Sequence, residues 1–247
     1  YVLTGEYEFI LLDLVRHLEE NKSLNDVLGL IYRTGAEVKI NPPRPLVDID
    51  KLPWPLRQGL PMDRYNDTPG DMPIPSAQML ASRGCPYKCK FCLWPQVMYQ
   101  SNAYRVRDVI DVVDEMQYLV QEMGFKSIYF DDDTFNCGRE RILRLCDEIR
   151  KRNLNIPWAI MARADLMSKE ILENMRSAGL FAVKYGVESA KQELLDSIGK
   201  DMDIKKTEDI IRFTKTLNVR THLTFTFGLP HETRESISET IDLALRL

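Results

Sequence analysis

Residues 77–95 read AQMLASRGCPYKCKFCLWP, an apolar run that leads directly into a cysteine-rich loop. The apolar part, residues 77–82, has the composition expected of a buried strand. Three cysteines follow within eight positions: Cys85, Cys89 and Cys92. Gly84 and Pro86 prevent a helix from starting there, so the loop can curl and the three thiols can converge on one centre. The stretch therefore predicts a strand that ends in a metal-binding loop.

A strand–helix pattern continues along the chain after residue 75. Four further strands are expected at residues 126–130, 157–162, 181–186 and 220–227. Helical periodicity separates these strands, and Ser168 and Thr233 are expected to cap two of the helices. Five parallel strands with outer helices indicate either a (β/α) barrel or a doubly wound sheet. Both architectures place functional loops at the carboxyl ends of the strands, where the cysteines lie.

The first third of the chain has a different pattern. Residues 1–40 predict a strand at 1–4, an amphipathic helix at about 9–18 and a hairpin that turns at Thr34 and Gly35. Residues 41–75 contain nine of the thirteen prolines, which excludes regular helix and central strand. Several large apolar side chains in this segment favour an ordered arm that packs on its neighbours over a flexible tether.

Composition narrows the functional class. The chain has 247 residues and a formal net charge of -4, without the basic stripe that binds nucleic acid. No apolar run approaches the roughly 20 residues that span a bilayer, so no transmembrane segment is expected. Five cysteines, three of them crowded, suit a metal in a reducing compartment better than a disulfide framework. A cytoplasmic location is therefore expected.

The number of thiols bears on the choice of metal. Structural zinc needs four ligands, usually as two paired sets. None of the remaining candidates has a ligand-like spacing: Cys137, Cys146, His17, His222 and His231. A [4Fe-4S] cluster usually takes four cysteines, one for each iron, so three leave one iron without a protein ligand. An open coordination position is typical of a catalytic metal site.

The pattern Cys85-x-x-x-Cys89-x-x-Cys92, after the first strand of a partial (β/α) barrel, resembles the signature of the radical S-adenosylmethionine (SAM) superfamily. The resemblance implies a [4Fe-4S] cluster on these three cysteines, with the open iron chelated by SAM. It also implies reductive cleavage of SAM to a 5'-deoxyadenosyl radical that abstracts hydrogen. The electron would come from a low-potential donor such as flavodoxin or ferredoxin.

The same resemblance suggests cofactor-binding residues at other strand ends. Phe91 would lie against the adenine, although a core aromatic is an equally good interpretation. Arg163, in the segment MARADL, would meet the cofactor carboxylate, and a surface ion pair is the alternative. Glu188 and Ser189, in YGVES, would hold the ribose or the amino-acid part. No residue is assigned to the chemical step.

Three adjacent carboxylates follow the second strand, in the segment FDDDTFN. Alternation along a strand sends Asp131 and Asp133 to one side and Asp132 to the other. Adjacent carboxylates repel one another unless a cation or amide donors meet them, and the ammonium of SAM is a suitable partner for Asp131. The alternative is that Asp133 or Thr134 caps the next helix.

The start YVLTGEYE, with the helix, hairpin and proline-rich arm, resembles the junction in the radical SAM subfamily with an N-terminal cobalamin-binding domain. This implies that residues 1–40 are the remnant of that Rossmann-like domain and that 41–75 are the connecting arm. Residues 76–247 would be the radical SAM core, truncated after the fifth strand and helix. Cobalamin is implied for the parent protein only.

The implied reactions are cobalamin-linked methyl transfer, cyclisation or rearrangement of a small-molecule, lipid or tetrapyrrole-like substrate. A protein of another class stays open as the alternative. It would be a non-catalytic iron–sulfur or structural zinc protein that keeps the cysteines for folding or electron transfer.

Overall fold

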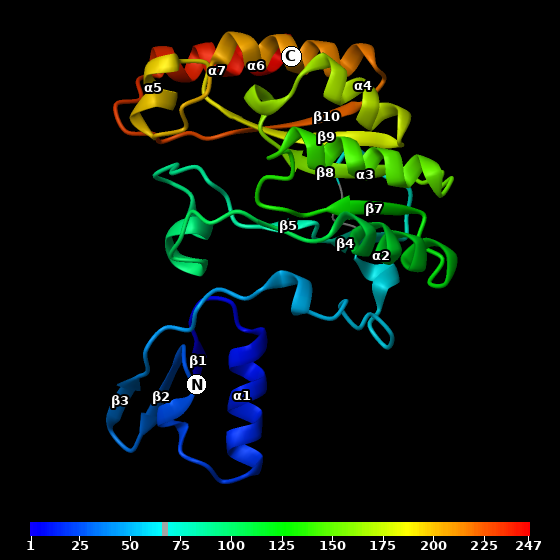
Figure 1. Ribbon diagram of the computed structural model, residues 1–247. Coiled ribbons are helices and arrows are strands. Elements are labelled where there is room, and N and C mark those ends of the chain that lie inside the picture. The colour runs from blue at the N-terminus through cyan, green and yellow to red at the C-terminus, as the bar shows by residue number, and fades with distance from the viewer. Residues whose placement is uncertain (66–68) are drawn as a thin grey trace.

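The central sheet of the computed structural model has five parallel strands in the order β10-β9-β8-β7-β4 (Figure 1). The strands are β4 Ser76–Met79, β7 Ser127–Phe130, β8 Trp158–Ala162, β9 Leu180–Glu188 and β10 Arg220–Phe225. The structure describes residues 1–65 and 69–247. The spatial order follows the chain order without the reversal that defines a doubly wound sheet. The sheet is therefore part of a (β/α) barrel, and the alternative architecture is wrong.

Helices cover one face of the sheet (Figure 1). They are α2 Val109–Gln121, α3 Arg139–Lys151, α4 Lys169–Ser177, α6 Ile204–Thr216 and α7 Arg234–Arg246, while the short helix α5 Gln192–Ser197 lies beyond the carboxyl ends of the strands. Trp158 is fully buried between this face and the helices, and its ring lies 5.9 Å from that of Phe130. Ser168 and Thr233 cap α4 and α7 as expected, each accepting a hydrogen bond from the first helical turn.

The first strand is shorter than residues 77–82. It ends at Met79, and Ser82–Arg83 instead form β5, which pairs antiparallel with β6, Arg105–Val106. The chain turns away from the sheet here, because the Ala81 amide donates a hydrogen bond of 2.9 Å to the carboxylate of Asp132. The cysteines therefore follow a small two-stranded ribbon, and the last strand likewise ends two residues early, at Phe225.

The N-terminal unit is a separate small layer (Figure 1). Its strands β1 Val2–Leu3, β2 Leu30–Thr34 and β3 Glu37–Ile40 form an antiparallel sheet, and helix α1 spans Glu8–Glu19. The predicted hairpin is confirmed. A core of five residues holds the unit together: Ile10, Leu14, Val27, Leu30 and Tyr32. Its origin in a cobalamin-binding domain stays a prediction.

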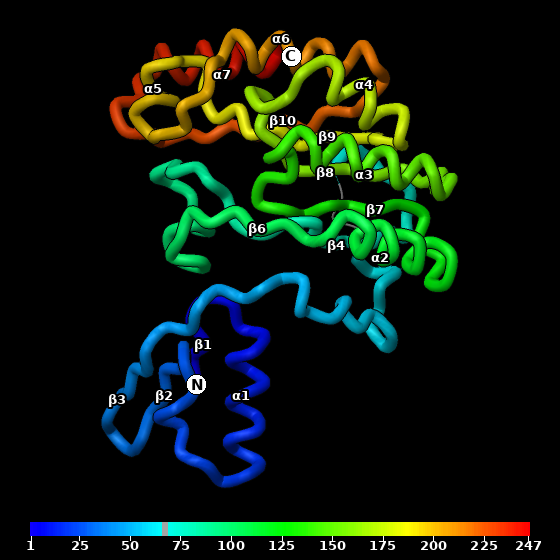
Figure 2. Tube along the Cα trace, viewed as in Figure 1, coloured from blue at the N-terminus to red at the C-terminus, as the bar shows by residue number. Residues whose placement is uncertain are grey.

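The proline-rich arm runs from this unit to β4 and is ordered in the parts described (Figure 2). The buried Arg57 side chain donates a hydrogen bond of 2.9 Å to Glu115 of α2 and one of 2.7 Å to the carbonyl of Gln78. The Trp54 indole donates 2.9 Å to Asp111, also in α2. Residues 66–68 of the predicted arm lie outside the described residues. Among those described, none of the helices has the length and apolar character needed to cross a membrane.

Candidate metal centre

The three cysteines lie on the loop between β5 and β6, each a free and partly exposed thiol. Burial raises the pKa of Cys89 and Cys92, and charge on Cys85 adds to both shifts. Lys200 and Arg163 oppose the shift at Cys89, so two cations lie near this thiol. Within the described part of the chain, no three His, Cys, Asp or Glu side chains, the three thiols included, lie close enough together to hold a single metal ion.

The end of β7 anchors the start of the cysteine loop. Asp132 is fully buried and accepts hydrogen bonds from the Ala81 amide and the Ser82 hydroxyl. The Asp133 carboxylate accepts a hydrogen bond of 2.8 Å from the Gly84 amide. These bonds across about 50 positions in sequence hold the loop against the sheet.

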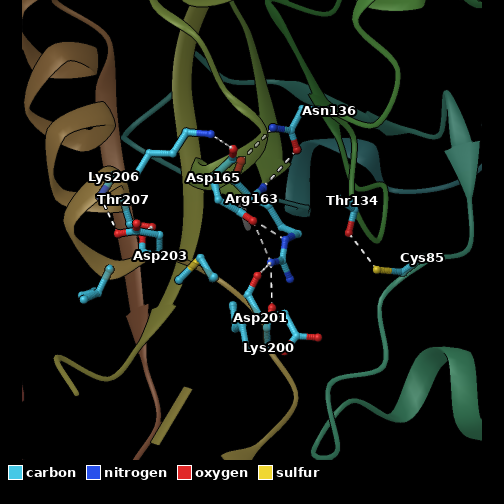
Figure 3. A network of polar contacts seen from close by, with 12 residues as sticks. Cys85, Thr134, Asn136, Arg163, Asp165, Lys200, Asp201, Asp203, Lys206 and Thr207 are labelled. Atoms are coloured by element: carbon cyan, nitrogen blue, oxygen red, sulfur yellow. Dashed lines mark hydrogen bonds and ion pairs between the residues drawn. The ribbon is translucent and has the colours of Figure 1, made fainter. Parts of the chain in front are cut away.

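The last contact of this anchor reaches a cysteine itself. The Thr134 hydroxyl lies 3.1 Å from the sulfur of Cys85 (Figure 3). Neither Asp133 nor Thr134 caps the next helix, since Gly138 holds the N-cap position of α3 without a side-chain bond. That alternative is wrong. Asp131 is exposed on the wall of a cavity of about 280 Å³ beside the arm.

The pKa of Asp132 makes this anchor sensitive to pH. Burial raises it from 3.8 to about 6, although the bonds from Ser82 and Ala81 oppose the shift. Because the folded pKa is the higher one, Asp132 stabilises the fold below about pH 4 and loses this contribution as pH rises toward 6. Asp132→Asn should therefore gain stability relative to the wild type between these pH values, by on the order of 2 kcal/mol.

Urea unfolding of both proteins across this pH range measures the difference. A difference in unfolding free energy that stays constant with pH would show that folding does not raise the pKa of Asp132.

Arg163 forms an ion pair, but not at the surface. Its guanidinium binds Asp165 through two hydrogen bonds of 3.0 and 2.9 Å. It also donates a hydrogen bond of 2.7 Å to the Lys200 carbonyl (Figure 3). The guanidinium also lies over the ring of Tyr87, whose centroid is 3.7 Å away, and donates a hydrogen bond of 3.4 Å to the Asp201 carbonyl. Tyr87 belongs to the cysteine loop, so this cation–π contact is a second anchor for the loop. The alternative of a surface ion pair is wrong because the residue is buried.

Glu188 forms a second buried ion pair at the rim. Its carboxylate lies 2.6 Å from the Lys200 ammonium and accepts 2.8 Å from the Thr226 hydroxyl. The backbone of Glu188 is left-handed, with φ +67°, a conformation that costs about 1 to 3 kcal/mol in a non-glycine residue and clusters at functional sites. Gly186 makes room for the pair, since a Cβ there would lie 2.5 Å from Glu188 Oε1.

The two remaining sequence candidates have opposite environments. Ser189 is fully buried, and its hydroxyl lies 3.4 Å from that of Thr240 in α7. It also accepts 3.2 Å from the Lys191 amide, so in this structure it joins β9 to the helices. Phe91 is 47% exposed, and a nearby single π-helical turn, Trp94–Met98, carries further exposed apolar side chains. Its ring is accessible to a ligand, and the interpretation as a core residue is wrong.

Three residues near the thiols were not singled out as ligands or anchors from the sequence. The first is Lys200, which was missed because its segment IGKD, just after α5, matches no local motif. Tyr87 is another, and its position between two cysteines was the available signal. Cys137 is the third, because charge on Cys85 adds to the burial that raises its pKa to about 11. Cys137 therefore lies in the same electrostatic environment as the loop thiols.

The residues present fit an iron–sulfur cluster held at three corners. One loop supplies three thiols, and thiolates are the usual ligands of such clusters. The buried side chains of Arg163 and Lys200 lie near Cys89 and favour its thiolate form, although each is also paired with a carboxylate. The loop is anchored at the ends of β7 and β8, which orients the thiols on the functional rim.

The family model described as the Radical SAM superfamily matches residues 79–244, more than half of the chain. An uncharacterized methyltransferase of Pyrococcus horikoshii is 32% identical over the whole chain, which covers 52% of that protein. An anaerobic magnesium-protoporphyrin IX monomethyl ester cyclase of Cereibacter sphaeroides is 30% identical over 98% of the chain, which covers 40% of it. The chain thus spans about half the length, or less, of these curated relatives.

A solved structure shows the same fold. The radical SAM methyltransferase TsrM of Kitasatospora setae, with tryptophan and a SAM analogue bound, superposes with a TM-score of 0.81 at 22% identity. The alignment covers 99% of this chain and 48% of TsrM. The likeness therefore extends through the N-terminal unit and the arm as well as the barrel.

Proposed function

The chain belongs to the radical SAM superfamily, and from this premise we propose that its cysteine loop forms the cofactor centre of a radical SAM enzyme. Cys85, Cys89 and Cys92 hold a [4Fe-4S] cluster in this proposal. The bound cluster and SAM together supply an electron and a 5'-deoxyadenosyl radical for hydrogen abstraction. The single observation that carries the proposal is the set of three free thiols on an anchored loop beside Arg163 and Lys200.

The rim suits a zwitterionic cofactor. Arg163 with Asp165 and Lys200 with Glu188 form two buried pairs, which together are neutral. The amino-acid part of SAM carries both a carboxylate and an ammonium group, so both charges find a partner at this rim. Lys200 touches both pairs, since its carbonyl accepts from Arg163 and its ammonium binds Glu188. We assign the amino-acid part of SAM to Arg163, Glu188 and Lys200.

The other sequence candidates take lesser parts in the proposal. Phe91 offers an exposed ring for the adenine. Asp131 faces a cavity lined by the arm, β4, β5 and α2, and we assign it to the substrate side. Ser189 supports β9 from beneath the rim, where its hydroxyl contacts Thr240.

The reaction class follows the relatives. A methyltransferase and a monomethyl ester cyclase both occur among them, which favours methyl transfer or cyclisation, and rearrangement is kept from the sequence resemblance. Residues 1–40 are proposed as the end of a cobalamin-binding domain, 41–75 as the arm and 76–247 as the radical SAM core. A small-molecule, lipid or tetrapyrrole-like substrate, a flavodoxin- or ferredoxin-like electron donor and a cytoplasmic location complete the proposal.

Metal analysis tests the proposal against a structural zinc site. After anaerobic reconstitution with iron and sulfide, we expect about four iron and four sulfide per chain and no bound zinc. Stoichiometric zinc that resists replacement by iron would overturn it.

The ion pair at the rim gives a separate prediction for SAM binding. Glu188→Gln keeps the size of the side chain but removes the charge that pairs with Lys200 and with the cofactor ammonium. We expect the dissociation constant for SAM to rise about tenfold or more, while the iron content is unchanged. Equilibrium dialysis of reconstituted protein against labelled SAM measures it.

The matched control is Glu239→Gln, which breaks the exposed pair between Lys191 and Glu239, also 2.6 Å long. It should bind SAM as the wild type does. Equal affinities in all three proteins would return Glu188 to a purely structural role.

A further inference from the structure

The cysteine loop is closed at its base by the ribbon of β5 and β6. In this ribbon Arg83 and Arg105 stand directly opposite each other. Two like charges opposite each other on paired strands repel, and a two-stranded ribbon is marginally stable by itself. Gly84 comes next, with φ +90°, and a Cβ there would lie 2.0 Å from the Ala103 carbonyl oxygen. The loop base is therefore tight but depends on something that neutralises the two arginines.

Two carboxylates of the N-terminal unit supply that neutralisation. Glu6 accepts a hydrogen bond of 3.2 Å from Arg83. It also accepts hydrogen bonds of 2.8 and 2.9 Å from the two terminal nitrogens of Arg105. The Glu6 carboxylate also accepts a hydrogen bond of 2.7 Å from the Val47 amide of the arm. Glu8 lies 2.5 Å from the second terminal nitrogen of Arg83. The Glu6 side chain is only 3% exposed, so these bonds form in a region of weak solvent screening.

The contacts continue from the two arginines to the loop itself. The Arg105 guanidinium lies 5.4 Å from the centre of the Tyr99 ring. Burial and the nearby charge of Asp133 raise the pKa of the Tyr99 hydroxyl, and Asp133 in turn accepts a hydrogen bond from the Gly84 amide. Arg83, which binds Glu6, directly precedes Gly84 in the chain, so the carboxylates act one residue from the anchored start of the loop.

We propose that Glu6 and Glu8 are positioning residues that hold the cysteine loop in its metal-binding conformation. The N-terminal unit then acts on the metal centre through charge, because displacing it would leave Arg83 and Arg105 facing each other without carboxylates. This inference rests on the proposed function for the identity of the metal centre. The positioning itself concerns the loop and is measurable without a cofactor.

Hydrogen–deuterium exchange of the metal-free chain tests the positioning. Three loop amides serve as probes because each is hydrogen-bonded: Gly84 to Asp133, Lys90 to Ile198 and Cys92 to Cys89. In Glu6→Gln, which preserves the side-chain volume, we expect these amides to exchange about tenfold faster or more. Amides of the central strand β8 should keep the wild-type rate.

The matched control is Glu170→Gln, which removes the carboxylate of the exposed ion pair with Arg139, 2.5 Å long. It should leave the loop amides unchanged. Wild-type exchange at the loop amides in Glu6→Gln would overturn the proposal. So would equal acceleration in β8, because that result describes loss of global stability.

A second readout uses the reconstituted protein. We expect Glu6→Gln to bind iron but to shift the midpoint potential or the electron paramagnetic resonance line shape of the reduced cluster. An unchanged potential and line shape would contradict the proposal. If the wild type assembles no cluster, the proposed function fails, and the exchange result still decides whether Glu6 positions the loop.

Discussion

Cys89→Ala is expected to reduce the iron bound per chain after anaerobic reconstitution to background, with loss of the cluster absorbance. Cys89 is the middle thiol of the loop and the one with cations Arg163 and Lys200 nearby. Removing it leaves two thiols, too few to hold the cluster at three corners. The far-ultraviolet circular dichroism should stay close to that of the wild type, because the loop lies outside the buried core.

Two other cysteines serve as controls for this experiment. Cys137→Ala removes a thiol that lies near Cys85, and Cys146→Ala removes one that is fully buried in the core. Both variants should keep the full iron content. Retained iron in Cys89→Ala would contradict the ligand assignment. Lost iron in Cys137→Ala would mean that Cys137 is a fourth protein ligand, so that no iron of the cluster is left open.

Gly84→Ala is expected to abolish cluster assembly while the barrel stays folded. A Cβ at this position would lie 2.0 Å from the Ala103 carbonyl oxygen, and the backbone φ of +90° is strained for any other residue. Since the obstacle is backbone and not a flexible side chain, β5 and β6 have to separate. Iron content after reconstitution and exchange of the Cys92 amide measure the effect.

Gly124→Ala is the matched control. Gly124 ends the turn after α2 with φ +76°, but a Cβ there meets nothing within 4 Å. This variant carries similar backbone strain without the collision, so it should bind iron normally at a cost of about 1 kcal/mol in stability. Equal iron content in the two variants would show that the tight approach at Gly84 is not needed.

Local patterns in the sequence were sufficient to predict the repeating strand–helix unit. The apolar strands, the helical periods and the caps at Ser168 and Thr233 depend on neighbours within a few positions, and the structure confirms them. The loop with Cys85, Cys89 and Cys92 was readable for the same reason. The same patterns left a barrel and a doubly wound sheet open, and the observed order of the strands in the sheet distinguishes the two.

The environment of the loop could not be read in this way, because its contacts join residues far apart in sequence. Asp132 and Asp133 reach back about 50 positions to the loop, so alternation along β7 gave no indication of their partners. Arg163 meets Tyr87 across 76 positions (163 − 87), and Glu6 meets Arg83 across 77. Pairings of this kind depend on the tertiary fold, which a local pattern does not contain.

Electron paramagnetic resonance of the dithionite-reduced, reconstituted chain, recorded with and without SAM, tests the central claim most directly. The account predicts the signal of a reduced four-iron cluster that changes when SAM is added, because one iron has no protein ligand and accepts the cofactor. A four-iron signal identical with and without SAM would contradict it, since the cluster would then have no open position.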